Sequence, residues 1–287
     1  YAKNFFNTCT TGDKSPMKGH KENKRLHFGA NMHFTMNYER TTAGEATGPV
    51  TVGWFLNLDT GAVIYDPPER LRTEGSNREH AKSAGRCPAV INMESRYFVI
   101  KSPIDLHLGF TRDEKGKPGL INRLSTKSPV RANKLNQMIS LTSESEWRFP
   151  NRPMIQMSLP YTFISDELVY LTQIAAFAHY RPEPLPGTIF GGRFPINVWP
   201  RPLMWAFEWH DTKKDLILKR GEPLFYCQFE ADGPDRPVAM VEADKTPELM
   251  AYVEHISGAV NYVNQTFSLF QAAERARPES LLKKKQR

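Results

Sequence analysis

One block of the chain, residues 191–230, constrains the fold more than any other. It has the sequence GGRFPINVWPRPLMWAFEWHDTKKDLILKRGEPLFYCQFE and carries three of the five tryptophans. Apolar residues alternate with other residues along 203–209 and 224–230, and turn residues interrupt the block at 210–212 and 219–221. Alternation with a period of two is typical of strands that bury one face. The block therefore predicts short antiparallel strands around an aromatic core.

The alternation also sorts the side chains of these two strands by face. The apolar faces carry Leu203, Trp205, Phe207 and Trp209 on the first strand and Phe225, Cys227 and Phe229 on the second. If the strands pair with these faces together, the opposite face carries Glu208, His210, Tyr226, Gln228 and Glu230. Carboxylates, an imidazole and a phenol suit acid–base chemistry or metal binding. Exposure to solvent is the commoner role of a polar strand face.

Further polar candidates lie around the proline-rich loop 181–187. His179 and Arg181 stand at its mouth, where polar side chains converge on ligands in many proteins. Arg193 and Arg201 lie among aromatic residues and prolines, which suits either an anion clamp or stacking on Trp199 or Trp205. The candidate ligand-binding residues are His179, Arg181, Arg193, Arg201, Glu208, His210, Tyr226 and Gln228. No catalytic, cofactor-binding or metal-binding signature occurs, so the sequence predicts no metal and no cofactor.

Several shorter apolar runs extend the β pattern beyond the block. They are Val50–Leu58, Ala62–Tyr65 after a turn, Tyr97–Lys101, Asp105–Thr111, Met154–Leu159 and Leu168–Ile174. The 22 prolines favour many short strands over long helices. These observations predict a mainly β protein, an antiparallel β-sandwich or a β-clip-like domain with a C-terminal helical segment. Its boundaries are an N-terminal arm at 1–49, the β domain at 50–243, and the helical segment with a basic tail at 244–287.

The C-terminal segment has the period of a helix. Residues 244–248 place a polar cap before a proline and an acid, which is a helix start. From there apolar residues recur at steps of four and three: Leu249, Val253, Ile256, Val260, Val263, Phe267 and Phe270. Two interpretations stay open. The stripe lies against the sheet as one helix or a broken pair, or it joins copies of the chain into a homo-oligomer.

The net charge of +7 is concentrated at the two ends of the chain. Residues 1–25 carry +4 and residues 283–287 carry +4, which leaves −1 for the part between them. This distribution argues against a nucleic-acid-reading face on the β domain. The basic ends are expected to be solvated, or to contact an acidic partner or nucleic acid. The three cysteines lack ligand spacing, and no apolar run is long enough for a membrane span. A location in the cytoplasm of a bacterial host or in a virion is expected.

A family resemblance rests on three segments: 86–108 (RCPAVINMESRYFVIKSPIDLHL), 191–200 (GGRFPINVWP) and 216–230 (LILKRGEPLFYCQFE). Together they resemble a group of uncharacterised phage and bacterial proteins that contain a domain of unknown function. The resemblance covers about residues 86–230 and implies a compact β protein without an activity to carry over. The last segment also resembles the closing strands of the dUTPase and dCTP-deaminase β fold.

The departures from that nucleotide-processing fold are large. Gly192, Arg193 and Phe194 stand where those enzymes place an aspartate after the glycine, and Tyr226 stands where they place glutamine. Their Pro-Arg-Ser-Ser phosphate loop is missing. The leading hypothesis is a non-catalytic, phage-type binding or assembly protein. The alternative is an enzyme on small molecules, either a nucleotide-directed hydrolase or a metal-dependent oxygenase, that uses the polar face of the Trp205 strand.

Overall fold

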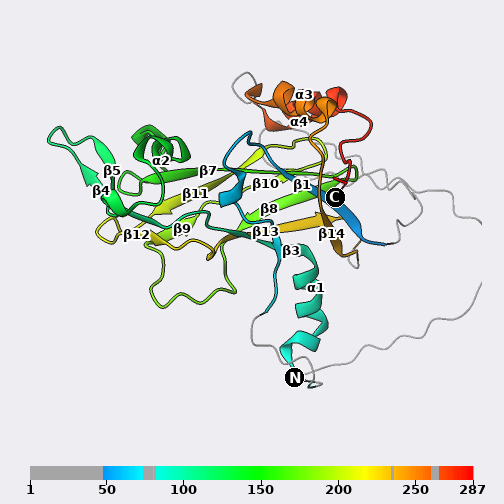
Figure 1. The fold of residues 1–287 in the computed structure, drawn as a ribbon, viewed down its shortest axis with the longest axis horizontal. Helices are drawn as coiled ribbons and strands as arrows, with labels where there is room; N and C mark the ends of the chain where they lie inside the picture. The colour runs from blue at the N-terminus through cyan, green and yellow to red at the C-terminus, as the bar shows by residue number, and fades with distance from the viewer. Residues whose placement is uncertain (1–47, 74–79, 81, 234–235, 260–264, 287) are drawn as a thin grey trace, which may run out of the picture. The chain divides into compact units, whose positions relative to one another are not determined.

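Three β-sheets form the body of the computed structural model (Figure 1). The structure describes residues 48–73, 80, 82–233, 236–259 and 265–286. All of these belong to one compact unit of the chain, Thr47–Arg287. The predicted N-terminal arm, residues 1–49, lies outside the described residues except for its last two positions.

The strands of the three sheets are nearly all antiparallel to their neighbours. The first sheet has the order β14-β1-β7-β11-β9, with β6 also on β7: β1 (Val50–Leu56), β6 (Ile139–Leu141), β7 (Met154–Ile164), β9 (Gly187–Ile189), β11 (Pro202–Trp209) and β14 (Val238–Glu242). The second has the order β10-β8-β13-β3-β2: β2 (Glu69–Arg70), β3 (Tyr97–Lys101), β8 (Val169–Ile174), β10 (Arg193–Pro195) and β13 (Pro223–Ala231). The third has the order β12-β4-β5: β4 (Leu106–Arg112), β5 (Pro118–Asn122) and β12 (Leu216–Leu218). Only β1 and β14 run parallel among the described pairs.

The described part of the chain has few helices, and they lie outside the sheets. The α-helices are α1 (Pro88–Arg96), α2 (Ala132–Met138), α3 (Pro247–Ile256) and α4 (Thr266–Ala276), and short 3-10 helices lie at Ala62–Ile64, Ala84–Arg86, Ser125–Lys127 and Glu144–Glu146. Figure 1 shows α3 and α4 on one side of the sheets and α1 on the other. The prediction of a mainly β protein with C-terminal helices is confirmed. No described helix has both the length and the apolar character of a membrane span.

One aromatic core joins the three sheets. The apolar faces predicted for the two strands within residues 191–230 are confirmed, because all seven of their residues are buried in this core. The rings of Phe163 on β7 and Phe229 on β13 meet at 5.2 Å between centroids and so join the first and second sheets. Leu108 and Leu216 add the third sheet to the same cluster.

One local prediction is wrong. Ala62–Ile64 is a 3-10 helix and not a strand, and Val63 is almost fully exposed, so this apolar run buries little. Residues 88–96, to which no element was assigned from the sequence, form α1. Pro88 at the first helical position is the signal that marks this helix, since its fixed φ angle and missing N–H suit a helix start.

The strands β11 and β13 do not pair with each other. The predicted polar face, which required this pairing, therefore does not form. β11 lies between β7 and β9 in the first sheet, whereas β13 lies between β3 and β8 in the second. Alternation identifies the buried face of each strand but contains no information about which strand is its neighbour.

The C-terminal helical stripe is divided between two helices. Leu249, Val253 and Ile256 on α3 are buried in one cluster with Phe55 and Ile164 of the first sheet. The interpretation as a broken helix pair against the sheet is therefore confirmed for α3, and these three residues are covered within the chain. Val260 and Val263 lie outside the described residues.

The backbone of the basic C-terminal end pairs with the end of β14 and the two residues after it. The Asp244 amide donates to the Lys283 carbonyl at 2.8 Å, and the Lys285 amide donates to the Glu242 carbonyl at 3.0 Å. The Lys285 ammonium also lies 2.6 Å from a Glu242 carboxylate oxygen. Residues 283–285 are exposed, so the expectation of a solvated C-terminal end is confirmed for them, while the backbone pairing gives this end a defined place beside β14.

Replacing Thr246 by alanine is expected to lower the free energy of unfolding by about 1 kcal/mol. Thr246 caps α3, since its Oγ1 accepts a hydrogen bond from the Leu249 amide at 3.2 Å. Urea unfolding measures the change. Thr246→Ser keeps the hydroxyl acceptor and serves as the control, and equal losses in the two variants would contradict the capping role.

Candidate functional site

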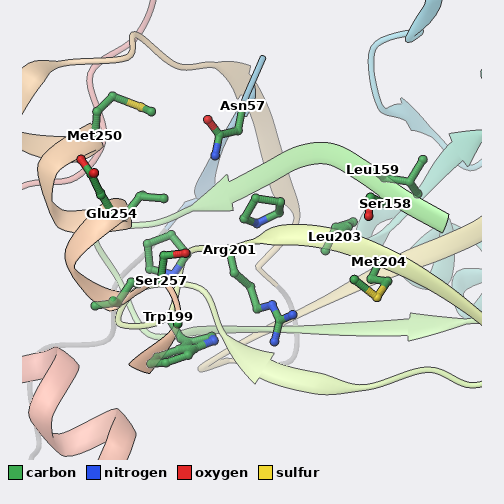
Figure 2. Close-up of a pocket in the computed structure, with 15 residues that line it drawn as sticks. Asn57, Ser158, Leu159, Trp199, Arg201, Leu203, Met204, Met250, Glu254 and Ser257 are labelled. Carbon is green, nitrogen blue, oxygen red and sulfur yellow. The ribbon is translucent and has the colours of Figure 1, made fainter. Parts of the chain in front are cut away.

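A pocket of about 520 Å³ lies where the start of β11 faces α3 (Figure 2). This volume lies within the range of small-molecule sites in proteins. Its walls come from the residue that follows β1, the middle of β7, the start of β11 with the three residues before it, and α3 with the turn that follows it. The lining residues are Asn57, Ser158, Leu159, Trp199, Pro200, Arg201, Pro202, Leu203, Met204, Met250, Val253, Glu254, Ile256, Ser257 and Gly258.

Most of the pocket wall is apolar. Leu159 and Leu203 are buried core residues that belong to the sheet side, and Val253 is buried on the helix side. Met204 and Met250 are half-buried on opposite walls. Methionine side chains adapt to different apolar shapes because they are unbranched and flexible. The pocket can therefore accept an apolar body without a narrow shape requirement.

Arg201 supplies a cation to this apolar pocket. Its side chain is accessible to solvent, yet the pocket walls displace enough water to lower the pKa of the guanidinium through desolvation. No described carboxylate lies within ion-pair distance of it, and in Figure 2 the Glu254 carboxylate points away from Arg201. The guanidinium N–H groups are thus available to an anion.

Fixed contacts hold the elements around the pocket in place. The Tyr252 hydroxyl on α3 lies 2.8 Å from the Val198 carbonyl and 2.9 Å from the Ala273 carbonyl on α4. Burial raises the pKa of Tyr252 to about 12, so this hydroxyl stays a donor at neutral pH. The Trp199 ring packs edge to face on Phe270 of α4 at 5.7 Å between centroids. These contacts connect the segment before β11 to α3 and α4, and so they fix the helix side of the pocket.

Glu208 and His210 form a second polar group, on the outer side of β11. Glu208 is only 3% exposed, and the His210 Nε2 lies 3.0 Å from its Oε1. Arg152 Nη1 lies 3.4 Å from the same oxygen, and Arg148 Nη1 lies 3.5 Å from Oε2. Salt bridges to two arginines explain how a carboxylate is tolerated at this depth.

Tyr226 does not join Glu208 and His210. It is buried on the outer face of β13 beside Leu71 and Val99, and its ring packs on Phe177. A single acid–base site made of Glu208, His210 and Tyr226 is therefore wrong, because the strands that carry them belong to different sheets.

The other predicted site residues are spread over the surface. Arg181 forms an ion pair with Glu222 at 3.1 Å, and Arg193 forms one with Glu230 at 2.9 Å while it stacks on Tyr170. His179 lies in the turn before the proline-rich loop, and Gln228 is half-buried on β13. These ion pairs engage the guanidinium groups of Arg181 and Arg193, although Arg193 also lines a second pocket of about 520 Å³ beside Tyr170 and Phe270. Arg201 lines its pocket without an ion pair among the described residues.

Sequence reasoning missed the α3 residues that line the Arg201 pocket and the arginines before β7 that pair with Glu208. Met250 and Glu254 lie four positions apart on α3 and so share a helix face, which a helical projection indicates. Arg148 and Arg152 flank Phe149 and Pro150. This combination of basic and aromatic residues could have identified the segment as a candidate site from the sequence. Among the described residues, no group of three or more histidine, cysteine or acidic side chains could hold a metal ion.

No protein-family model matches the chain, and no curated protein or solved structure resembles it significantly. The resemblance to phage and bacterial proteins and to the dUTPase fold therefore stays a prediction, and the site alone carries the functional argument.

Proposed function

We propose that this chain is a non-catalytic binding protein whose pocket between β11 and α3 takes a small organic anion with an apolar body. The observation that carries the proposal is the Arg201 guanidinium, which has no carboxylate partner among the described residues and lies in a pocket whose wall is mostly apolar. An apolar wall binds a hydrocarbon or aromatic body, and a single cation selects an anionic head group. Neither part requires a reacting residue.

The enzyme alternative depended on a shared site of Glu208, His210 and Tyr226, and the structure does not bring these residues together. The strands that carry them belong to two different sheets, and Tyr226 is buried away from Glu208. Binding therefore remains the better-supported class. Self-association, assembly into a virion, and contacts of the basic ends with acidic partners stay predictions from the sequence.

Calorimetric titration with linear carboxylates from butyrate to decanoate, and with the matching alcohols, tests the proposal. We expect the carboxylates to bind more tightly as the chain lengthens, and each one to bind more tightly than its alcohol. Arg201→Gln is expected to weaken carboxylate binding by about 10- to 100-fold, because a charge-assisted hydrogen bond is lost, and to leave alcohol binding unchanged.

Arg220→Gln is the matched control. Arg220 is exposed in the turn before β13, and among its described contacts only its backbone amide has a partner, Asp105. Its replacement should leave all affinities as they are. No heat of binding for any carboxylate, or the same loss in both arginine variants, would remove the Arg201 pocket as the functional site.

A further inference from the structure

Four side chains form an alternating stack on the outer surface of the first sheet. The Arg148 guanidinium carbon lies 5.6 Å from the Phe149 ring centroid and 5.2 Å from the Phe190 ring centroid. The Arg152 guanidinium carbon lies 4.4 Å from the Phe149 centroid. We refer to Arg148, Phe149, Arg152 and Phe190 as the Arg–Phe stack.

The buried Glu208 carboxylate forms ion pairs with both arginines of this stack. Its carboxylate lies within 3.5 Å of one nitrogen of Arg148 and within 3.4 Å of one nitrogen of Arg152. One negative charge therefore faces two permanent positive charges, so the group keeps a surplus of positive charge even when His210 is neutral. The Glu208 Oε2 makes no hydrogen bond within the described structure, and Arg148 Nη1 lies 3.5 Å from it.

The stack faces solvent although two of its members are phenylalanines. Phe149 is 43% exposed and Phe190 is 49% exposed, while the Arg148 and Arg152 side chains are 54% and 43% exposed. Each guanidinium has five N–H donors, and the carboxylate occupies only a part of them. The surface thus offers unused cationic donors beside exposed aromatic rings.

We propose that the Arg–Phe stack binds a nucleoside phosphate. The phosphate would lie on the outward N–H groups of Arg148 and Arg152, whose planar forks match phosphate oxygens. The base would stack on the exposed phenyl rings, since every nucleobase presents a flat π surface. A simple carboxylate would use the arginines but not the rings, so the combination favours an anion joined to an aromatic base. The ligand is either a free nucleotide or part of a single-stranded nucleic acid.

The stack and the Arg201 pocket make independent predictions. They share none of their residues, so a ligand for one does not require the other. The nucleotide proposal therefore stands if the organic-anion proposal fails, and the reverse also holds.

Fluorescence anisotropy of the full chain with two probes tests the inference. The probes are a fluorescent adenosine monophosphate analogue and a fluorescein-labelled single strand of twelve thymidines. We expect saturable binding of at least one probe. Binding of the strand alone identifies nucleic acid as the source of the ligand, and binding of the mononucleotide with similar affinity identifies a free nucleotide.

Variants of the stack should weaken the binding that is observed. Arg148→Gln and Phe190→Ala are each expected to lower the affinity about tenfold or more, by loss of a phosphate contact and of a stacking surface. The controls are Arg220→Gln and Tyr180→Ala, which change an exposed arginine and a tyrosine that is 84% exposed, and neither residue belongs to the stack. Arg201→Gln should also bind the probes normally.

Three results would overturn the inference. The first is no binding of either probe by the wild-type chain at millimolar protein concentration in low salt. The second is an equal loss of affinity in the control variants. The third is competition by inorganic phosphate as strong as that by adenosine monophosphate, together with full binding by Phe190→Ala, because the rings would then contribute nothing. Circular dichroism of each variant confirms that the fold is retained.

Discussion

Trp205→Ala is expected to lower the free energy of unfolding by about 3–5 kcal/mol. Trp205 is 1% exposed in the middle of β11, and its indole stacks on Phe207 at 5.1 Å between ring centroids. It lies in the core that all three sheets share. Its removal leaves a cavity, because the sheets would have to move toward one another to fill the space. The loss of apolar contacts and the cavity itself add to the cost.

Guanidinium unfolding followed by far-ultraviolet circular dichroism measures this effect. Trp205→Phe keeps an aromatic ring and should cost less, which preserves a measurable variant if the alanine variant does not fold. Tyr180→Ala removes an exposed ring and should change the free energy of unfolding by no more than about 0.5 kcal/mol. A loss for Trp205→Ala as small as that of Tyr180→Ala would contradict the assignment of the β11 aromatics to the core.

The buried faces of the strands were the part of the fold that the sequence predicted best. In β11 and β13 large apolar residues recur at every second position, and an extended strand satisfies this pattern by turning that face toward the core. The structure confirms it for Leu203 through Trp209 and for Phe225 through Phe229. This information is local, because it depends only on the geometry of one extended strand.

Strand pairing and the polar surroundings were not predictable in the same way. Glu208 was expected on an exposed or shared face, but Arg148 and Arg152, more than fifty residues earlier, cover it. Tyr226 follows the same alternation on β13, yet its outer face is closed by Leu71 and Val99. Such burial depends on which distant segments pack together, and a periodic pattern within one strand does not contain that information.

The Arg201 pocket was predictable from the sequence only in part. Sequence reasoning identified Arg201 as a candidate anion ligand from its aromatic and proline neighbours. It offered no means to choose Arg201 over Arg193, since the two have similar local sequences. The difference arises from partners far along the chain, because Arg193 meets Glu230 and Arg201 meets the apolar wall of α3.

Gly191→Ala is expected to lower the free energy of unfolding by about 1–3 kcal/mol, as overpacking against a fixed backbone does. Gly191 lies between β9 in the first sheet and β10 in the second, where the chain passes close to β8. A Cβ at this position would lie 2.0 Å from the Gln173 carbonyl oxygen. That oxygen belongs to a strand backbone, so it cannot rotate away as the end of a side chain would.

The adjacent glycine provides the control for this close approach. A Cβ on Gly192 would meet no atom within 4 Å, so Gly192→Ala should change the free energy of unfolding by no more than about 0.5 kcal/mol. Urea unfolding of the two variants separates the close contact from any general effect of replacing a glycine in this segment. Similar losses in both would show that the contact with Gln173 is not the cause.

The same pair of variants connects the backbone to the surface stack. Phe190 precedes Gly191, and its amide donates to the Ala206 carbonyl of β11 at 2.8 Å, which fixes Phe190 beside Arg148. Any shift that relieves the contact of a Gly191 methyl group with β8 must move this segment. Gly191→Ala should therefore weaken nucleotide binding in the anisotropy assay, whereas Gly192→Ala should not. If Gly191→Ala bound the probes with wild-type affinity, the placement of Phe190 would not depend on this close approach to β8.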